Sequence, residues 1–236
     1  MGEWLKQSQR TRMTPGAIIT SNKTPLYQHH IEAGAKIVDF SGWQMPIHYG
    51  SQLEEHHAVR QSAGVFDVSH MNVVDLHGRD SKPFLQLLLA NNVEKLTTPG
   101  KALYSCMLTE SGGIIDDLIV YFMIDDWYRV ILNAGTHDKD MAWITQQLQN
   151  FTVITLSERP DLAMLEFQGP KAIAAFTSLL SDGDAGKVSE LEVFQACELE
   201  NMFVGRTGYT GEDGVEVILD SDAAVDLWQK LMDIGV

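Results

Sequence analysis

Residues 102–133, ALYSCMLTESGGIIDDLIVYFMIDDWYRVILN, contain three apolar segments separated by two turns. The segments Ala102–Leu108, Asp117–Ile124 and Tyr128–Asn133 predict strands, because they are rich in β-branched and aromatic residues. Gly112-Gly113 and Asp125-Asp126 predict the turns between them. Connections as short as these join antiparallel neighbours, so the stretch predicts consecutive hairpins.

Helices are predicted between groups of such strands, not after every strand. The expected helices are Gln52–Ser62, Asp80–Leu89, His137–Gln149 (capped by Thr136), a helix opening at Gly169-Pro170, and Asp222–Met232 (capped by Ser221). The other expected strands are Ala35–Phe40, Asn72–Leu76, Val153–Leu156, Ala163–Phe167, Phe194–Glu198, Met202–Arg206 and Val215–Leu219. This grouping favours an α+β fold with mainly antiparallel sheets over a doubly wound parallel sheet.

The length of 236 residues is enough for one large domain or two small ones. We expect a flexible N-terminal arm at 1–22, a first α+β lobe at 23–150 and a second at 151–236. Residues 1–22 lack the apolar segment of a secretory signal, and no apolar run approaches the ~18 residues of a membrane helix. Cys106 and Cys197 are predicted to be buried, reduced thiols of an intracellular protein.

The net charge of −15 argues against binding to nucleic acid or to an anionic membrane, since both partners attract cationic surfaces. The acidity is concentrated near the end of the sequence, where residues 182–236 carry three basic and thirteen acidic residues, a net −10. A segment this acidic suggests that a basic partner or further chain lies beside it.

The first candidate for chemistry is the segment from Gly112 to Val120, in which Asp116 and Asp117 enter an otherwise apolar strand. Adjacent strand residues face opposite sides, so only one of the two carboxylates can point into a given pocket. Two interpretations remain open from the pattern. Both aspartates are turn residues satisfied by backbone N–H groups, or one is a half-buried carboxylate aimed at a cationic or N–H-bearing ligand.

The second candidate is the segment Gly205–Glu216, GRTGYTGEDGVE, with four glycines at three-residue intervals. It lacks the G-x-x-x-x-G-K-[ST] pattern of a phosphate loop and the acid spacing of an EF-hand. A glycine-rich loop that carries Tyr and Glu suits a flat heterocycle with N–H donors, because one carboxylate accepts two donors side by side. The alternative is a tight loop whose glycines serve the backbone alone.

Clustered histidines raise the possibility of a metal site, but their spacing does not support one. The pairs His29-His30 and His56-His57 are adjacent, and no H-E-x-x-H occurs. We therefore predict no metal site, and expect hydrogen-bonded or surface histidines instead.

Several segments in order resemble one known family, the tetrahydrofolate-dependent aminomethyltransferase (T protein) of the glycine cleavage system. The matching segments are TPLY (24–27), VDFSGWQMP (38–46), GVFDVSHM (64–71), ALYS (102–105), GGIIDDLIV (112–120) and RTGYTGEDGVE (206–216). The resemblance implies two α+β lobes that cradle a pterin, followed by a C-terminal β-barrel domain that this sequence lacks. We therefore expect a chain that is truncated relative to the family.

The resemblance also implies site residues and partners. It assigns the functional carboxylate to Asp116 and folate contacts to Tyr209 and Glu216, with Met71, Tyr104 and Asn133 lining the pocket. The implied reaction moves a one-carbon unit from the aminomethyl-lipoyl arm of H protein to tetrahydrofolate, giving 5,10-methylenetetrahydrofolate and ammonia. An ionised carboxylate would orient the reacting nitrogens and stabilise the positive charge that develops as ammonia leaves.

The implied location is the cytoplasm of a bacterium, or the mitochondrial matrix in a eukaryote. Two alternatives stay open. One is a non-catalytic folate-binding protein of the same superfamily, of the kind that assists iron–sulfur enzymes, and the other is a plain interaction domain.

Overall fold

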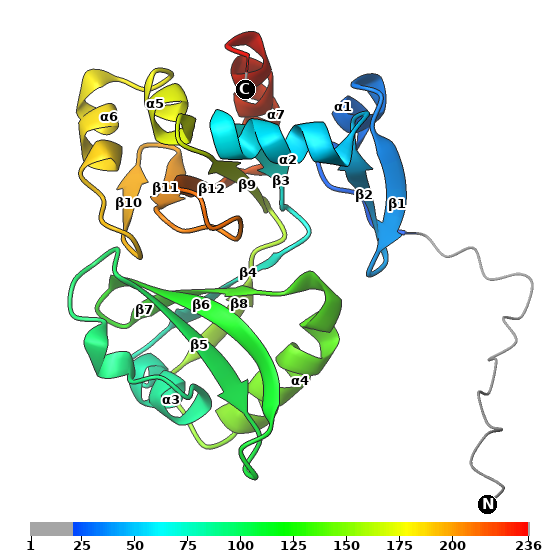
Figure 1. The fold of residues 1–236 in the computed structure, drawn as a ribbon. Coiled ribbons are helices and arrows are strands. Elements are labelled where there is room, and N and C mark those ends of the chain that lie inside the picture. Colours follow the sequence, from blue (N-terminus) through cyan, green and yellow to red (C-terminus); the bar gives the residue numbers. More distant parts are fainter. Residues whose placement is uncertain (1–20, 236) are drawn as a thin grey trace, which may run out of the picture.

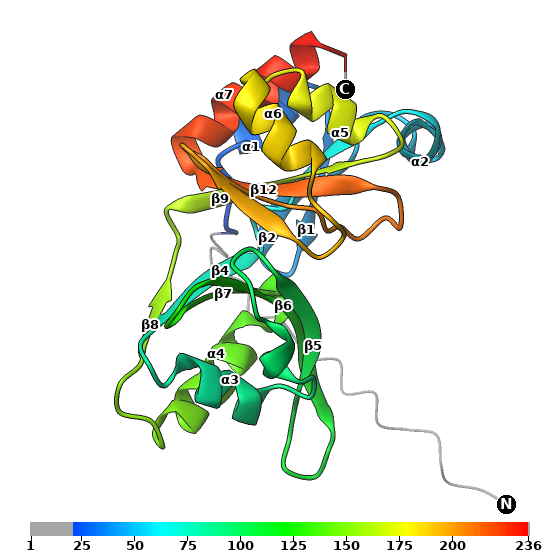
Figure 2. The same cartoon turned by 90° about the vertical axis from the view of Figure 1, so that its left-hand side faces the viewer.

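The computed structural model describes residues 21–235 and consists of two five-stranded antiparallel sheets that face each other (Figure 1). Helices cover the outer face of each sheet, so the layers run helix, sheet, sheet, helix (Figure 2). All strand pairs in these sheets are antiparallel, which confirms the predicted α+β class. Residues 1–20 of the expected arm lie outside the described residues. Asn22, at its end, forms an isolated bridge with Trp43.

The first sheet has the strand order β5-β6-β7-β4-β8. Its strands are β4 (Asn72–His77), β5 (Ala102–Leu108), β6 (Ile114–Ile124), β7 (Trp127–Leu132) and β8 (Thr155–Glu158). The helices α3 (Ser81–Leu88) and α4 (His137–Leu148) cover its outer face, with 3-10 turns at Val93–Lys95 and Ala134–Thr136. The predicted hairpins are confirmed. β6 begins before the predicted strand because Ile114 still pairs with Leu108 across an irregularity in the ladder.

The second sheet has the order β10-β11-β12-β9-β3. Its strands are β3 (Gly64–Asp67), β9 (Leu162–Gln168), β10 (Ala196–Leu199), β11 (Met202–Gly205) and β12 (Gly214–Asp220). The covering helices are α5 (Ala172–Thr177), α6 (Asp182–Ser189) and α7 (Ser221–Asp233). A peripheral unit comprises α1 (Tyr27–Glu32), the hairpin β1 (Lys36–Phe40) and β2 (Trp43–His48), and α2 (Gln52–Gln61).

Three apolar cores follow from the alternation of side chains along the strands. One lies between the first sheet and α3 and α4, and another between the second sheet and its helices. The third lies between the two sheets and draws on both, with Ile119 and Ile131 from one and Met164, Phe203 and Ile218 from the other. We call the surfaces that meet at this third core the inter-sheet faces.

The division between the sheets differs from the predicted lobe boundary between residues 150 and 151. β3 pairs with β9 in the second sheet, and β8 pairs with β4 in the first. The chain therefore leaves the second sheet after Asp67 and returns to it after Glu158. Short strands acquire their partners from tertiary packing, and their local pattern does not record which sheet they join.

Candidate functional site

Asp116 lies on the helix-covered side of β6. It pairs with Met107, a fully buried residue of the core beneath α3 and α4. Its carboxylate accepts hydrogen bonds from Asn133 Nδ2, at 3.2 Å to each oxygen, and from the hydroxyl of Thr136. Thr136 precedes α4 as predicted, but its hydroxyl serves Asp116 and makes no capping hydrogen bond.

Asp140 of α4 is the other carboxyl group beside Asp116. Burial, with Asp116 as a neighbour, raises the pKa of Asp140 to about 7. Burial also tends to raise the pKa of Asp116, but the neighbouring carboxyl group of Asp140 and the hydrogen bonds from Thr136 and Asn133 bring it below its usual value. Asp116 is thus an ionised group whose hydrogen-bonding partners all belong to the protein.

Asp117 occupies the opposite, inter-sheet face of β6. Its neighbours along the strand on this face, Ile119 and Tyr121, belong to the core between the sheets. The phenol of Tyr104, on β5, donates to Asp117 Oδ2 at 2.8 Å. That hydrogen bond is the main cause that raises the pKa of Tyr104 to about 12. Tyr104 nevertheless keeps 49% of its surface exposed, so the pair borders open space.

Glu216 faces this pair from β12 of the second sheet. Only 2% of its surface is exposed, and burial raises its pKa. Its Oε2 accepts from the hydroxyl of Thr207 and from Tyr121 Oη at 3.4 Å. Its Oε1 is buried and has no hydrogen-bond partner among the described residues. A buried oxygen without a partner is costly, so this atom marks a place where a ligand donor would be stabilised.

Tyr209 lies among these groups, on the loop between β11 and β12. Burial raises its pKa. The neighbouring carboxyl groups of Glu216, Glu166 and Asp117 and the phenol of Tyr104 raise it further. Its backbone N–H donates to Glu166 Oε1 at 2.7 Å, while 57% of the residue's surface stays exposed.

Gln168 of β9 secures the loop that carries Tyr209. Its Nε2 donates to the carbonyl of Thr207 at 3.1 Å, and its Oε1 accepts from Thr210 Oγ1 at 2.6 Å. A Cβ at Gly208 would lie 2.1 Å from Gln168 Nε2, and its φ of +157° also favours glycine. The glycine spacing of this loop therefore reflects close packing against Gln168, at least at this position.

The structure brings four of the six predicted site residues to one side. Tyr104, Tyr209 and Glu216 face the inter-sheet region, and Met71 packs against its core. Asp116 and Asn133 contact each other on the helix side of β6, so the assignment of the functional carboxylate to Asp116 does not agree with the geometry. Its neighbour Asp117 lies on the inter-sheet face with Tyr104 and Tyr209. Of the two adjacent aspartates, the one that the resemblance assigned therefore faces away from Tyr104, Tyr209 and Glu216.

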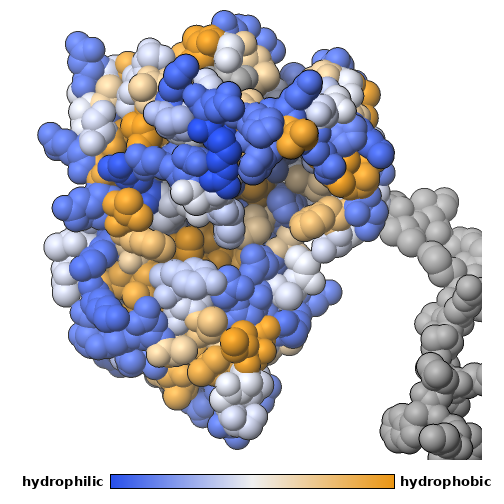
Figure 3. All heavy atoms as spheres, viewed as in Figure 1, coloured by the Kyte–Doolittle hydropathy of each residue, from blue (hydrophilic) through white to orange (hydrophobic). Residues whose placement is uncertain are grey.

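Sequence reasoning also missed Glu166 and Gln168. The available signal was an acidic and an amide residue within β9, whose sequence LAMLEFQ is otherwise apolar. Glu166 directly opposes Glu216 of β12. On the face seen in Figure 3, the surface is hollowed between the two sheets, and apolar residues border the hollow.

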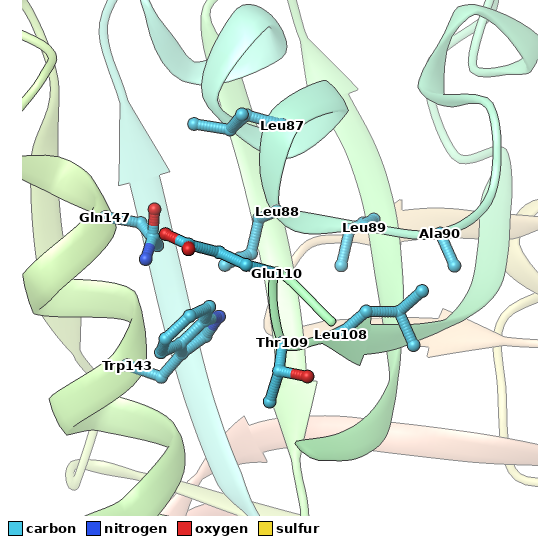
Figure 4. Close-up of a pocket in the computed structure, with 9 residues that line it drawn as sticks. All are labelled: Leu87, Leu88, Leu89, Ala90, Leu108, Thr109, Glu110, Trp143 and Gln147. Carbon is cyan, nitrogen blue, oxygen red and sulfur yellow. The ribbon is translucent and has the colours of Figure 1, made fainter. Parts of the chain in front are cut away.

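A separate cavity of ≈ 270 Å³ lies on the helix side of the first sheet (Figure 4). Leu87, Leu88 and Trp143 form its apolar wall, and Glu110 and Gln147 its polar one. It is not part of the Asp117 site, because α3 and α4 line it.

The histidines show no metal-binding arrangement. No group of three His, Cys, Asp or Glu side chains suited to a metal ion occurs within residues 21–235. His30 is fully buried and contacts Asp67 Oδ2 at 2.9 Å and Tyr49 Oη at 2.7 Å, as expected of a hydrogen-bonded histidine. Cys106 and Cys197 are free thiols, half-buried where full burial was predicted. None of the helices in the described part of the chain is long and apolar enough to span a bilayer.

Comparison with known proteins identifies relatives over most of the chain. Residues 26–236 match the family described as the GCVT N-terminal domain. A curated aminomethyltransferase of Nitrosomonas eutropha is 55% identical over 214 residues, which cover 90% of this chain and 59% of the relative. One from Xylella fastidiosa is 54% identical over 219 residues, covering 91% and 59%.

A solved structure agrees with these matches. The crystal structure of glycine cleavage system aminomethyltransferase T from Bartonella henselae superposes with a TM-score of 0.81 at 33% identity, covering 90% of this chain and 57% of that one. The chain thus spans 59% of the length of the two curated relatives.

Proposed function

The chain belongs to the GCVT N-terminal domain family, and from this premise we propose that its protein is an aminomethyltransferase of the glycine cleavage system. The reaction proposed is the transfer of a one-carbon unit from the aminomethyl-lipoyl arm of H protein to tetrahydrofolate. The products are 5,10-methylenetetrahydrofolate, ammonia and the dihydrolipoyl arm, so the two hydrogens lost from the folate nitrogens end on the amine and on the thiol.

The observation that carries this proposal is the buried Oε1 of Glu216, which has no partner in the described part of the chain. A pterin edge presents an amino group and a ring N–H side by side, and a carboxylate accepts both. Glu216 is therefore the proposed anchor of the pterin, with the exposed ring of Tyr209 as a stacking or hydrogen-bonding neighbour. Met71 is proposed to line the same side.

Asp117 is the proposed functional carboxylate, in place of Asp116. The support is its position on the inter-sheet face, where it shares the surroundings of Tyr209 with Glu216. The hydrogen bond from Tyr104 holds its orientation. A carboxylate at this point orients the reacting nitrogens and stabilises the cationic character that develops as ammonia leaves. Asp116 and Asn133 then have a structural role, since their hydrogen bonds stabilise β6 on its helix-covered face.

We also propose lipoylated H protein as the partner and the bacterial cytoplasm as the location. The curated relatives from bacteria, named aminomethyltransferase, support the enzyme over a non-catalytic folate-binding protein. A catalytic protein must also engage the lipoylated partner, whereas the non-catalytic alternative need only bind folate.

Isothermal titration calorimetry of the chain with tetrahydrofolate tests the binding step. We expect saturable heat from the parent chain and a loss of that heat in Glu216→Ala. The exposed Glu198 of β10 gives a matched control, because Glu198→Ala removes a carboxylate of the same sheet outside the site. The absence of heat from the parent chain at high ligand concentration would reject folate binding by this chain. Turnover with aminomethylated H protein then separates the enzyme from the non-catalytic alternative.

A further inference from the structure

Glu166 and Glu216 form a pair of buried carboxyl groups, of which the proposed function assigns a role to Glu216 alone. They are directly opposed on the antiparallel strands β9 and β12, so both side chains leave the sheet on the inter-sheet face. Their outer neighbours in the same row across the sheet are Gly205 beside Glu216 and Phe66 beside Glu166. The exposed fractions of the two glutamates are only 3% and 2%.

Among the described residues, no positively charged side chain pairs with either of these glutamates. The titratable groups that face Glu166 are Glu216 from β12 and Tyr209 from the loop, and Tyr121 of β6 faces Glu216. Two buried like charges without a cation are strongly unfavourable, so one carboxyl group retains a proton.

The hydrogen bonds indicate which of the two keeps that proton. Glu216 Oε2 accepts from the hydroxyl of Thr207, and Tyr121 Oη lies 2.9 Å from Thr207 Oγ1 and 3.4 Å from Oε2. These linked hydroxyls stabilise the ionised form of Glu216. Glu166 accepts only the backbone N–H of Tyr209 among the described residues. Burial and the proximity of Glu216 raise the pKa of Glu166 to about 7.

We propose that Glu166 is a positioning residue of the ligand site, which holds the backbone of Tyr209 and retains a proton so that Glu216 stays ionised for two N–H donors. Proton retention by Glu166 and its hydrogen bond from the Tyr209 N–H are inferred from the geometry of the described residues alone. The identity of the donor edge as a pterin rests on the proposed function.

A dependence of ligand affinity on pH follows from this arrangement. A ligand that covers the pair removes water from Glu166 and disfavours its ionised form further. The ligand therefore binds preferentially while Glu166 is protonated, and affinity falls as the pH rises above neutrality. One proton coupled in this way changes affinity by at most about tenfold per pH unit.

Thermal unfolding without ligand tests proton retention. The folded-state pKa of Glu166 is raised above its unfolded value, so its cost to stability is absent in acid and grows as the pH rises towards the folded pKa. Glu166→Gln removes that cost and keeps an oxygen to accept the Tyr209 N–H. We expect the Tm of Glu166→Gln relative to the parent to increase by roughly 5 °C between pH 5 and pH 8.5.

Glu198→Gln is the matched control, because Glu198 is an exposed carboxylate on β10 of the same sheet. Its Tm difference from the parent should stay constant across the same pH range. A Tm difference for Glu166→Gln that is equally independent of pH would overturn proton retention by Glu166, whether or not folate binds.

Calorimetry with tetrahydrofolate tests the positioning role. The parent should lose roughly tenfold in affinity from pH 7 to pH 8.5, and Glu166→Gln should show a flat profile. Glu166→Ala leaves the Tyr209 N–H without its acceptor and should bind more weakly at every pH, and Glu166→Gln should restore that affinity. Equal affinities and parallel pH profiles for all three proteins would reject the positioning role. Absence of binding by all three would reject the proposed function, and the unfolding data would still decide proton retention.

Discussion

Buried charge occurs in two places on the inter-sheet faces, and the protein neutralises only one of them. Asp75 of β4 accepts two hydrogen bonds from Arg129 of β7, at 2.9 and 3.0 Å, and a third from Arg159 at 2.9 Å. Glu166 and Glu216 have no such partner in the described part of the chain. The first group is a closed ion pair that holds two strands together, whereas the second is open in the sense that Glu216 Oε1 has no partner among the described residues. On the inter-sheet faces of the described residues, carboxylates without a cationic partner therefore lie at the ligand site.

The largest expected effect comes from breaking the closed group. Arg129→Met leaves the buried carboxylate of Asp75 with Arg159 alone, and loss of one partner of a buried pair costs about 3–5 kcal/mol. Urea unfolding measures this loss. Arg159→Met is the control, since its side chain is 32% exposed and its loss should cost clearly less. Equal losses for the two variants would contradict the view of Asp75–Arg129 as the main structural pair.

The next effect separates the two aspartates of β6. Asp117→Asn should lower turnover roughly 10²- to 10³-fold, as is typical when one preorganised electrostatic group is removed, with little change in Tm. Asp116→Ala leaves the donors of Asn133 and Thr136 unpaired, so it should cost about 1–3 kcal/mol of stability and change turnover much less. Steady-state kinetics and thermal unfolding of both variants measure these effects. The reverse pattern would restore Asp116 as the functional carboxylate.

A smaller effect is expected when the open group loses its acceptor. Glu216→Gln replaces one carboxylate oxygen by an NH₂ group, which faces the ligand donors with a donor of its own. We expect tetrahydrofolate affinity to fall roughly 10- to 100-fold by calorimetry, the value of one or two charge-assisted hydrogen bonds. Because the folded-state pKa of Glu216 is raised, the empty variant should gain stability relative to the parent as the pH rises from 5 to 8. An unchanged affinity would remove Glu216 from the ligand site.

The smallest effect concerns an exposed ion pair at the edge of the site. Arg60 of α2 donates to Glu212 of the Tyr209 loop at 2.8 Å, with side chains 40% and 28% exposed. Arg60→Ala should cost roughly 0.5 kcal/mol, and less in 1 M NaCl, because water and salt screen such pairs. Urea unfolding at both salt concentrations measures the difference. A salt-independent loss of unfolding free energy as large as that of Arg129→Met would contradict the expected difference between buried and exposed ion pairs.

Much of the local structure was predictable from the sequence, because it depends on short-range pattern. The hairpins of residues 102–133 follow from apolar segments and turn residues, and β5 has the predicted bounds. Shorter elements such as β3, β2 and α6 were missed, since four to eight residues carry too little periodicity to identify them. The helix predicted to open at Pro170 begins only at Ala172.

The candidate site, too, was predictable from the sequence only in part. The glycine-rich loop with Tyr209 and Glu216 was recognisable as a site for a heterocycle with N–H donors, and the alternation of Asp116 and Asp117 required one of them to face away. Local sequence could not decide which, because the answer depends on which face of β6 receives α4 and which receives the second sheet.

By itself, then, the sequence determined the α+β class, the central hairpins, the family and the loop that bears Tyr209 and Glu216. Only the tertiary structure decided that β3 joins β9, that Asp117 and not Asp116 faces Tyr209, and that Glu166 stands opposite Glu216. The physical reason is that strand pairing and the environment of a buried charge are set by residues far apart in the chain. Their mutual burial has no signature in any single segment.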